Sequence, residues 1–194
     1  IIQYFENLDE EYNPEEDIKE PAEEQTEDKE EFPVVKNNKI SSFYESRDAV
    51  NIVAVCGLCQ ENISLGVIVG KSGYGKTHTL KQYAKKGRVC YIECDDSMTS
   101  RDLVDAVGLS VGIPRGSGGT VWSRVQAIKD FFDINEGYLL IIDEADKLLT
   151  KYSAKKMEII RTIFDQCRVG LVVAGEPALE SMLKLYLPRF ANRA

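Results

Sequence analysis

Short apolar runs alternate with segments of helical periodicity from about residue 41 onward. The runs predict four strands, at Leu65–Val69, Arg88–Glu93, Tyr138–Glu144 and Val169–Ala174. Spaced apolar residues and capping residues predict helices from Ser41 or Ser42 to about Glu61, and over Lys76–Lys86, Ser100–Val111, Thr120–Ile134 and Ala154–Gln166. Continuous apolar strands that alternate with helices are typical of an α/β fold whose mostly parallel sheet is covered on both faces.

The beginning of the chain differs sharply in composition from the rest. Residues 1–36 hold 14 of the 32 acids and 3 of the 24 basic residues and carry a net charge of −11, whereas the following 18 acids and 21 bases carry +3. Such a segment has too little apolar surface to offset the entropy of ordering. We therefore expect a disordered acidic segment over 1–38 and one domain over 39–194. The segment is either a solubilising linker, a docking site that uses its apolar patch at residues 1–8, or a competitor of nucleic acid for a basic face.

The length of 194 residues and the 43% hydrophobic content suit a single domain with its own core. No apolar run approaches the roughly 20 residues of a membrane-spanning helix. The first residues also lack the basic and apolar regions of a signal peptide. These features predict a cytoplasmic protein that does not contact a membrane.

The five cysteines are an odd number and lie in apolar segments, as reduced core thiols do. An alternative is a zinc site made of the pair Cys56 and Cys59 with the pair Cys90 and Cys94. The first pair lies on a predicted helix and the second on a predicted strand, without the turn residues of a zinc knuckle. We therefore favour core thiols.

A glycine-rich motif follows the first predicted strand directly and precedes a predicted helix. Residues 70–77 read G-x-x-x-x-G-K-T, the pattern of a P-loop, in which successive backbone N–H groups surround phosphate at a helix N-terminus. Lys76 is expected to meet the β- and γ-phosphates, and the hydroxyl of Thr77 to bind Mg²⁺. The expected nucleotide contacts are Gly70, Ser72, Gly73, Tyr74, Gly75, Lys76, Thr77 and His78.

Two acids follow the third predicted strand, at Asp143 and Glu144. In open α/β sheets ligands bind beyond the carboxyl ends of the strands, where the P-loop also lies. Asp143 is therefore expected to hold Mg²⁺, through water, and Glu144 to orient and polarise the water that attacks ATP. The sequence predicts an ATPase with ATP and Mg²⁺ as ligands.

Four features of the sequence resemble AAA+ ATPases. They are the P-loop, the apolar run that ends in Asp-Glu-Ala-Asp at 143–146, the strand that ends at Val172-Val173-Ala174-Gly175, and the basic stretch 188–193. The motif at 70–77, the helix before it and Gly175-Glu-Pro-Ala-Leu are similar to the transposition ATPases of the phage Mu B and TniB/TnsC type. The resemblance covers residues 41–194 and not the acidic segment.

The resemblance implies that ATP binds between neighbouring subunits, and that rings or filaments assemble on double-stranded DNA, deliver it to a transposase and stimulate that enzyme. It also makes Arg189 and Arg193 the candidates for an arginine finger that reaches the γ-phosphate of a neighbour. The alternative for each is an ordinary basic helix end. The sequence does not distinguish between the two arginines.

The sequence departs from the AAA+ pattern at two points. The sensor position after the fourth strand, which commonly carries a hydrogen-bond donor, is Glu176, and an ionised carboxylate only accepts. The chain also ends at Ala194, before the expected fifth strand and helical lid. From the first departure we expect either altered sensing or a sensor role at another residue, and from the second we expect weaker nucleotide binding and assembly.

Contacts with DNA are expected to be directed to phosphate and independent of base sequence. The candidates are Arg115, Lys147, Lys151, Lys155 and Lys156. A lysine-rich helix start is also a common solvated surface, so this assignment stays open.

Three functions therefore remain open. The first is an ATP-dependent DNA-binding regulator of transposition, whose hydrolysis controls disassembly. The second is a P-loop switch in signalling or secretion that acts on a protein partner without binding DNA. The third is an assembly subunit that binds nucleotide without turnover, which Glu176 and the missing lid suggest.

Overall fold

The computed structural model describes residues 46–115, 119–149 and 154–186, with side chains described up to residue 184. The predicted acidic segment 1–38 lies outside these ranges, as do the predicted caps Ser41 and Ser42. So do part of the loop before the helix at 120–134, Lys151, and both finger candidates, Arg189 and Arg193.

The core of the described chain is a sheet of four parallel strands in the order β1-β4-β3-β2. The strands are β1 Leu65–Val69, β2 Val89–Glu93, β3 Tyr138–Asp143 and β4 Val169–Gly175. Because all pairs are parallel, their carboxyl ends meet at one edge, where Val69 lies opposite Gly175 and Glu93 opposite Asp143. The predicted α/β fold with a parallel sheet is confirmed.

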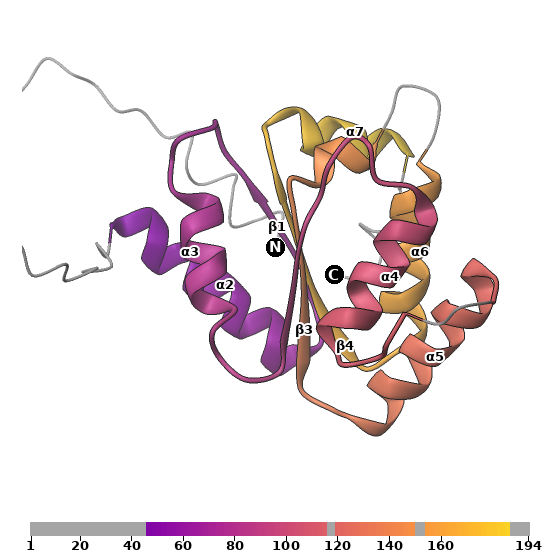
Figure 1. The fold of residues 1–194 in the computed structure, drawn as a ribbon. Helices are drawn as coiled ribbons and strands as arrows, with labels where there is room; N and C mark the ends of the chain where they lie inside the picture. Colours follow the sequence, from indigo (N-terminus) through magenta and orange to yellow (C-terminus); the bar gives the residue numbers. More distant parts are fainter. Residues whose placement is uncertain (1–45, 116–118, 150–153, 187–194) are drawn as a thin grey trace, which may run out of the picture. The chain divides into compact units, whose positions relative to one another are not determined.

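Helices cover both faces of this sheet, as Figure 1 shows. On one face lie α2 (Arg47–Asn62) and α3 (Lys76–Tyr83), and on the other α4 (Ser100–Ser110), α5 (Val121–Ile134) and α6 (Lys155–Gln166). Strand β3 is buried on both sides, with Leu139 and Ile141 in the α2–α3 core and Leu140 and Ile142 in the other core. Burial on both faces explains why the parallel strands are continuously apolar.

Several element boundaries differ from the prediction, most of them by one residue and those of α2 and α3 by more. The first helix begins at Arg47, because Ser46 has an extended backbone and its hydroxyl accepts a hydrogen bond from the N–H of Ala49 at 3.1 Å. That is the contact of a helix N-cap, so Ser46 replaces the predicted Ser41 or Ser42. Helix α3 ends at Tyr83, three residues before the predicted Lys86.

The structure also contains two short elements that the sequence pattern did not predict. A single 3₁₀ turn, η1 (Ala145–Leu148), follows β3, and helix α7 (Ala178–Tyr186) follows β4. Both begin at the carboxyl edge of the sheet, so they frame the same edge as the P-loop.

The cysteines are buried thiols on opposite sides of the sheet. Cys56 and Cys59 belong to the α2–α3 core, and Cys90 and Cys94 belong to the core under α4, α5 and α6. The sheet therefore separates the two pairs, and no group of three or more metal-binding side chains occurs among the described residues. The zinc alternative is excluded there. None of the described helices is long and apolar enough to cross a membrane.

Candidate functional site

The glycine motif forms the turn between β1 and α3. Gly73 and Gly75 have φ values of 88° and 78°, in the left-handed region that favours glycine, and Gly75 is the N-cap of α3. A Cβ atom added at either position meets no atom within 4 Å, so both face open space. The two glycines therefore allow the chain to turn into α3, and they leave open space beside the loop for a ligand.

Lys76 points back into this loop. Its ammonium donates to the carbonyl oxygens of Gly70 at 2.5 Å and Lys71 at 3.0 Å, and the residue is only 8% exposed. An ammonium has three donor positions, so the two backbone contacts hold the charge at the mouth of the turn. The lysine is thus already placed where the motif requires a cation.

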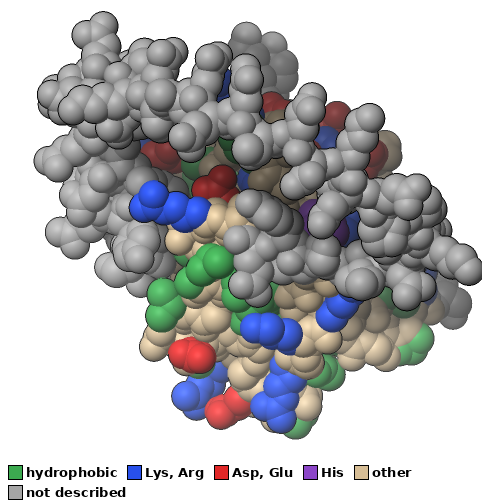
Figure 2. All heavy atoms as spheres, turned by 90° about the vertical axis from the view of Figure 1, so that its left-hand side faces the viewer, with side chains coloured by type: hydrophobic (Ala, Val, Ile, Leu, Met, Phe, Trp, Pro, Cys, Tyr) green, Lys and Arg blue, Asp and Glu red, His purple; other side chains and the backbone are tan. Residues whose placement is uncertain are grey.

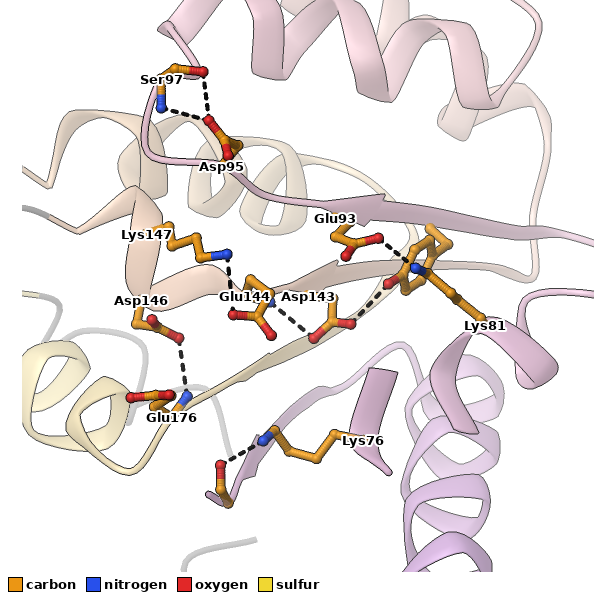
Figure 3. A network of polar contacts seen from close by, with 12 residues as sticks. Lys76, Lys81, Glu93, Asp95, Ser97, Asp143, Glu144, Asp146, Lys147 and Glu176 are labelled. Carbon is orange, nitrogen blue, oxygen red and sulfur yellow. Dashed lines mark hydrogen bonds and ion pairs between the residues drawn. The ribbon is translucent and has the colours of Figure 1, made fainter. Parts of the chain in front are cut away.

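Asp143 lies at the end of β3, where its carboxylate is fully buried and fixed by two donors (Figure 3). Its Oδ2 accepts from the hydroxyl of Tyr91 at 2.8 Å, and its Oδ1 accepts from the N–H of Glu144 at 2.9 Å. Burial raises the pKa of the Tyr91 phenol, and the hydrogen bond to the Asp143 carboxylate raises it further, because both favour the neutral phenol. Tyr91 therefore acts as a donor to Asp143.

Glu144 was predicted to end the strand, but the strand stops one residue earlier. Its backbone is left-handed, with φ of 55° and ψ of 37°, which turns the chain into η1. Its Oε2 lies 3.4 Å from Nζ of Lys147, one turn further on. Burial acts to lower the pKa of Lys147, but the Glu144 carboxylate, its hydrogen bond and the charges of Asp96 and Asp146 together outweigh this effect, so the pKa of Lys147 is raised.

The acid at the end of the Asp-Glu-Ala-Asp run joins β3 to β4. Oδ1 of Asp146 accepts from the backbone N–H of Glu176 at 3.0 Å (Figure 3). On the other side, the carbonyl of Gly175 accepts from the N–H of Gly70 at 3.2 Å. The end of β4 is therefore held between the P-loop and the acidic turn, and the exposed Glu176 takes part through its backbone.

Helix α3 is also tied to the acidic edge by an ion pair. Lys81 on α3 lies 2.6 Å from the carboxylate of Glu93, the residue opposite Asp143 in the parallel pairing. Nζ of Lys81 also lies 5.8 Å from the ring centroid of Tyr91. The cation offsets the charge of Glu93 beside the buried Asp143 carboxylate.

The sequence motifs did not single out Tyr91, Asp146 as a link to β4, or the pair of Lys81 with Glu93. Asp146 stood within the acidic run, so a signal was present. Tyr91 and Lys81 carry no motif of their own and are recognised only from their contacts across the fold.

The predicted DNA-binding residues have different surroundings. Lys156 is half-buried and donates to the carbonyl of Met98 at 3.0 Å, and Lys147 pairs with Glu144. Arg115 and Lys155 are exposed, and Lys151 lies outside the described residues. These residues stay candidates. Figure 2 shows the side of the molecule that α2 and α3 cover, where lysines and arginines are dispersed among acids and apolar side chains.

These residues fit a magnesium nucleotide. The open turn of Gly73 and Gly75 offers backbone N–H groups at a helix N-terminus, and Lys76 provides the cation there. Oxygen ligands suit Mg²⁺, and Asp143 offers an oriented carboxylate on the same edge of the sheet. The side chain of Thr77 is partly exposed at the start of α3.

The chain is similar to a curated protein described as the Mu-like prophage FluMu DNA transposition protein B of Haemophilus influenzae. The two are 29% identical over 148 residues, which cover 74% of this chain and 48% of that protein. Among solved structures, the ORC1 protein of Aeropyrum pernix in complex with DNA has a TM-score of 0.59 and 18% identity, and covers 74% of this chain and 41% of its own. The ORC2 protein of the same organism, in ADPNP–ADP complexes, has a TM-score of 0.57 and 18% identity, over 74% of this chain and 44% of its own.

This chain therefore spans about half the length of the relatives it matches. At these identities the solved structures establish the shared fold. The family model described as "AAA domain" matches residues 60–183, from the end of α2 into α7, and includes both the P-loop and the acidic edge. The chain belongs to the AAA family of ATPases.

Proposed function

We propose that this chain binds Mg·ATP at residues 70–77 and hydrolyses it to control its binding to DNA in transposition. The observation that carries the proposal is the meeting of the P-loop, the buried Asp143 and the adjacent Glu144 at one edge of the sheet. A parallel sheet brings these groups together although they are about 70 residues apart in sequence.

Within this proposal each residue has a separate role. The backbone of the turn and Lys76 bind the phosphates, and Thr77 and Asp143 hold Mg²⁺, which supplies charge neutralisation at the phosphates. Glu144 accepts the proton of the attacking water, and its pairing with Lys147 keeps the side chain at the acidic edge. Arg189 or Arg193 of a neighbouring copy completes the site.

The proposed DNA binding and action on a transposase are supported by the likeness to the FluMu DNA transposition protein B. The positive charge of the chain after residue 36 suits a polyanionic partner. Self-association into a ring or filament on double-stranded DNA, stimulation of hydrolysis by DNA, and a cytoplasmic location are further parts of the proposal.

Nucleotide binding and phosphate release test the catalytic part. Lys76→Ala should lose binding of a fluorescent ATP analogue, whereas Lys85→Ala, at an exposed lysine just after the end of α3, should retain it. Glu144→Gln should bind ATP normally and hydrolyse it roughly 10²–10⁴-fold more slowly, the usual contribution of a general base. Equal hydrolysis by Glu144→Gln and the unchanged chain would remove Glu144 from the mechanism.

A further inference from the structure

We propose that Tyr91 is a positioning residue for magnesium, which holds the Asp143 carboxylate in the orientation that the Mg·nucleotide requires. The inference rests on the proposed function, because it concerns how Asp143 performs its role. The hydroxyl of Tyr91 donates to Asp143, so Tyr91 would act through that carboxylate.

The side chain of Tyr91 reaches Asp143 because of how the two strands pair. Tyr91 on β2 lies opposite Ile141, and Glu93 lies opposite Asp143. Alternate residues share a face of a sheet, so Tyr91, Ile141 and Asp143 all lie on the face covered by α2 and α3. Asp143 is the diagonal neighbour of Tyr91 on the adjacent strand, within reach of a long aromatic side chain. The Tyr91 hydroxyl lies 2.8 Å from Oδ2 of Asp143.

The hydrogen bond matters because it fixes a second oxygen of the buried carboxylate. Among the described residues, Oδ1 of Asp143 accepts from the N–H of the next residue, which fixes the group at one end. The Tyr91 hydroxyl comes from another strand and fixes Oδ2. A carboxylate has about four acceptor positions, so two donors leave acceptor capacity for a magnesium-bound water.

Tyr91 is also contacted by a residue of α3, the helix that follows the P-loop. Lys81, five residues after Lys76 on α3, lies near its ring and pairs with Glu93. Lys81, Glu93 and Tyr91 therefore link the helix that follows the P-loop to the Asp143 carboxylate. Figure 3 shows the ion pair of Lys81 with Glu93 beside Asp143.

Binding of a fluorescent ATP analogue, titrated with Mg²⁺, tests this role with Tyr91→Phe, which removes only the hydroxyl. Loss of an outer-shell partner typically weakens metal affinity 10–100-fold, so the Mg²⁺ concentration for half-maximal binding should rise about 10-fold. Binding measured in excess EDTA should not change. The matched control is Tyr83→Phe, which removes a hydroxyl that donates to Gln60 Oε1 at 2.8 Å, away from Asp143.

Two outcomes would overturn the inference. An unchanged Mg²⁺ requirement in Tyr91→Phe would show that the hydrogen bond does not position Asp143 for the metal, and an equal loss of binding with and without Mg²⁺ would reveal a merely structural role. Asp143→Ala separates this failure from failure of the proposed function. If Asp143→Ala raises the Mg²⁺ requirement and Tyr91→Phe does not, only the role of Tyr91 is wrong; if neither raises it, the assignment of Asp143 is wrong as well.

Discussion

The carboxylate of Asp146 accepts a hydrogen bond from the backbone N–H of Glu176, 30 residues further along the chain, at 3.0 Å. The same oxygen leaves no room for a side chain at Gly175, where an added Cβ would lie 2.3 Å from it. The acidic turn after β3 therefore packs directly against the end of β4, with the Asp146 carboxylate next to Gly175, which has no side chain. The end of β4 also bonds to the start of the P-loop, so this contact sets the spacing across the site.

Gly175→Ala should destabilise the protein by about 1–3 kcal/mol, the usual cost of overpacking, because Asp146 must move or lose its contact with Glu176. Gly108→Ala is a matched control inside α4, where the nearest atom to an added Cβ is 3.7 Å away. Since alanine is better than glycine within a helix, this control should gain about 0.5–1 kcal/mol. Urea unfolding measures both, and an equal effect of the two changes would contradict the close approach at Gly175.

Two replacements of Asp146 measure the contribution of its hydrogen bond to the stability of the protein. Asp146→Asn keeps an oxygen that can accept from the N–H of Glu176, whereas Asp146→Ala leaves that N–H without its partner. A hydrogen bond of this kind contributes about 1 kcal/mol, so the alanine variant should be less stable than the asparagine variant by about that amount. Urea unfolding of the two variants side by side is the measurement; equal stabilities would mean that the contact contributes nothing.

The buried thiols should make the protein less stable at alkaline pH. Burial raises the pKa of Cys56 from 9.0 to about 12, with the neighbouring Cys59 adding to the shift. A folded pKa above the unfolded one leaves stability intact below pH 9 and removes it as the pH rises toward 12, because only the unfolded chain ionises in that range. At pH 10 the loss from this thiol should be about 1 kcal/mol, since each pKa unit corresponds to about 1.4 kcal/mol.

Urea unfolding at pH 7.5 and pH 10 measures this loss. Cys56→Ala should be less stable than the unchanged chain at pH 7.5, because it leaves a space in the core, but its further loss on going to pH 10 should be smaller by about 1 kcal/mol. An identical pH-dependent loss in both proteins would rule out Cys56 as a source of alkaline instability.

The DNA-binding candidates should contribute unequally. Lys155 is exposed at the start of α6, whereas Lys156 is half-buried and reaches the carbonyl of Met98. Lys155→Ala should weaken DNA binding and reduce the slope of log affinity against log salt by about 0.9, the amount for one phosphate contact. The control is Lys184→Ala, an exposed lysine on α7 that pairs with Glu180 at 2.6 Å. A salt slope that Lys155→Ala and Lys184→Ala change equally would count against a DNA contact at Lys155.

The parts of the fold and site that were predictable depend on residues close in sequence. The P-loop is a contiguous pattern after an apolar strand, and the end of β3 is marked by adjacent acids, so both were visible. The order β1-β4-β3-β2 depends on packing between distant segments, which periodicity does not encode. The hydrogen bond from Tyr91 to Asp143 crosses between strands 52 residues apart, so only the register reveals it.

Local signals in the sequence explain the differences at the start of α2 and at α7. Ser41, Ser42 and Ser46 all suit a helix cap, and the choice of Ser46 follows from its extended backbone and its contact with Ala49. Two signals mark the start of helix α7, Pro177 just before Ala178 and the acid Glu180 in its first turn. The prediction relied on the spacing of apolar residues and missed them.

The central claim is that nucleotide held at the P-loop controls binding to DNA. It is tested most directly by filter retention of duplex DNA of mixed sequence by Glu144→Gln, with ATP and Mg²⁺, with ADP and Mg²⁺, and without nucleotide. The account predicts strong retention with ATP and Mg²⁺ and weak retention in the other two conditions. Raised salt should weaken this retention, and adding the second change Lys76→Ala should abolish it. Equal retention in all three conditions would contradict nucleotide control, and no retention even at low salt would favour a switch that acts on a protein partner.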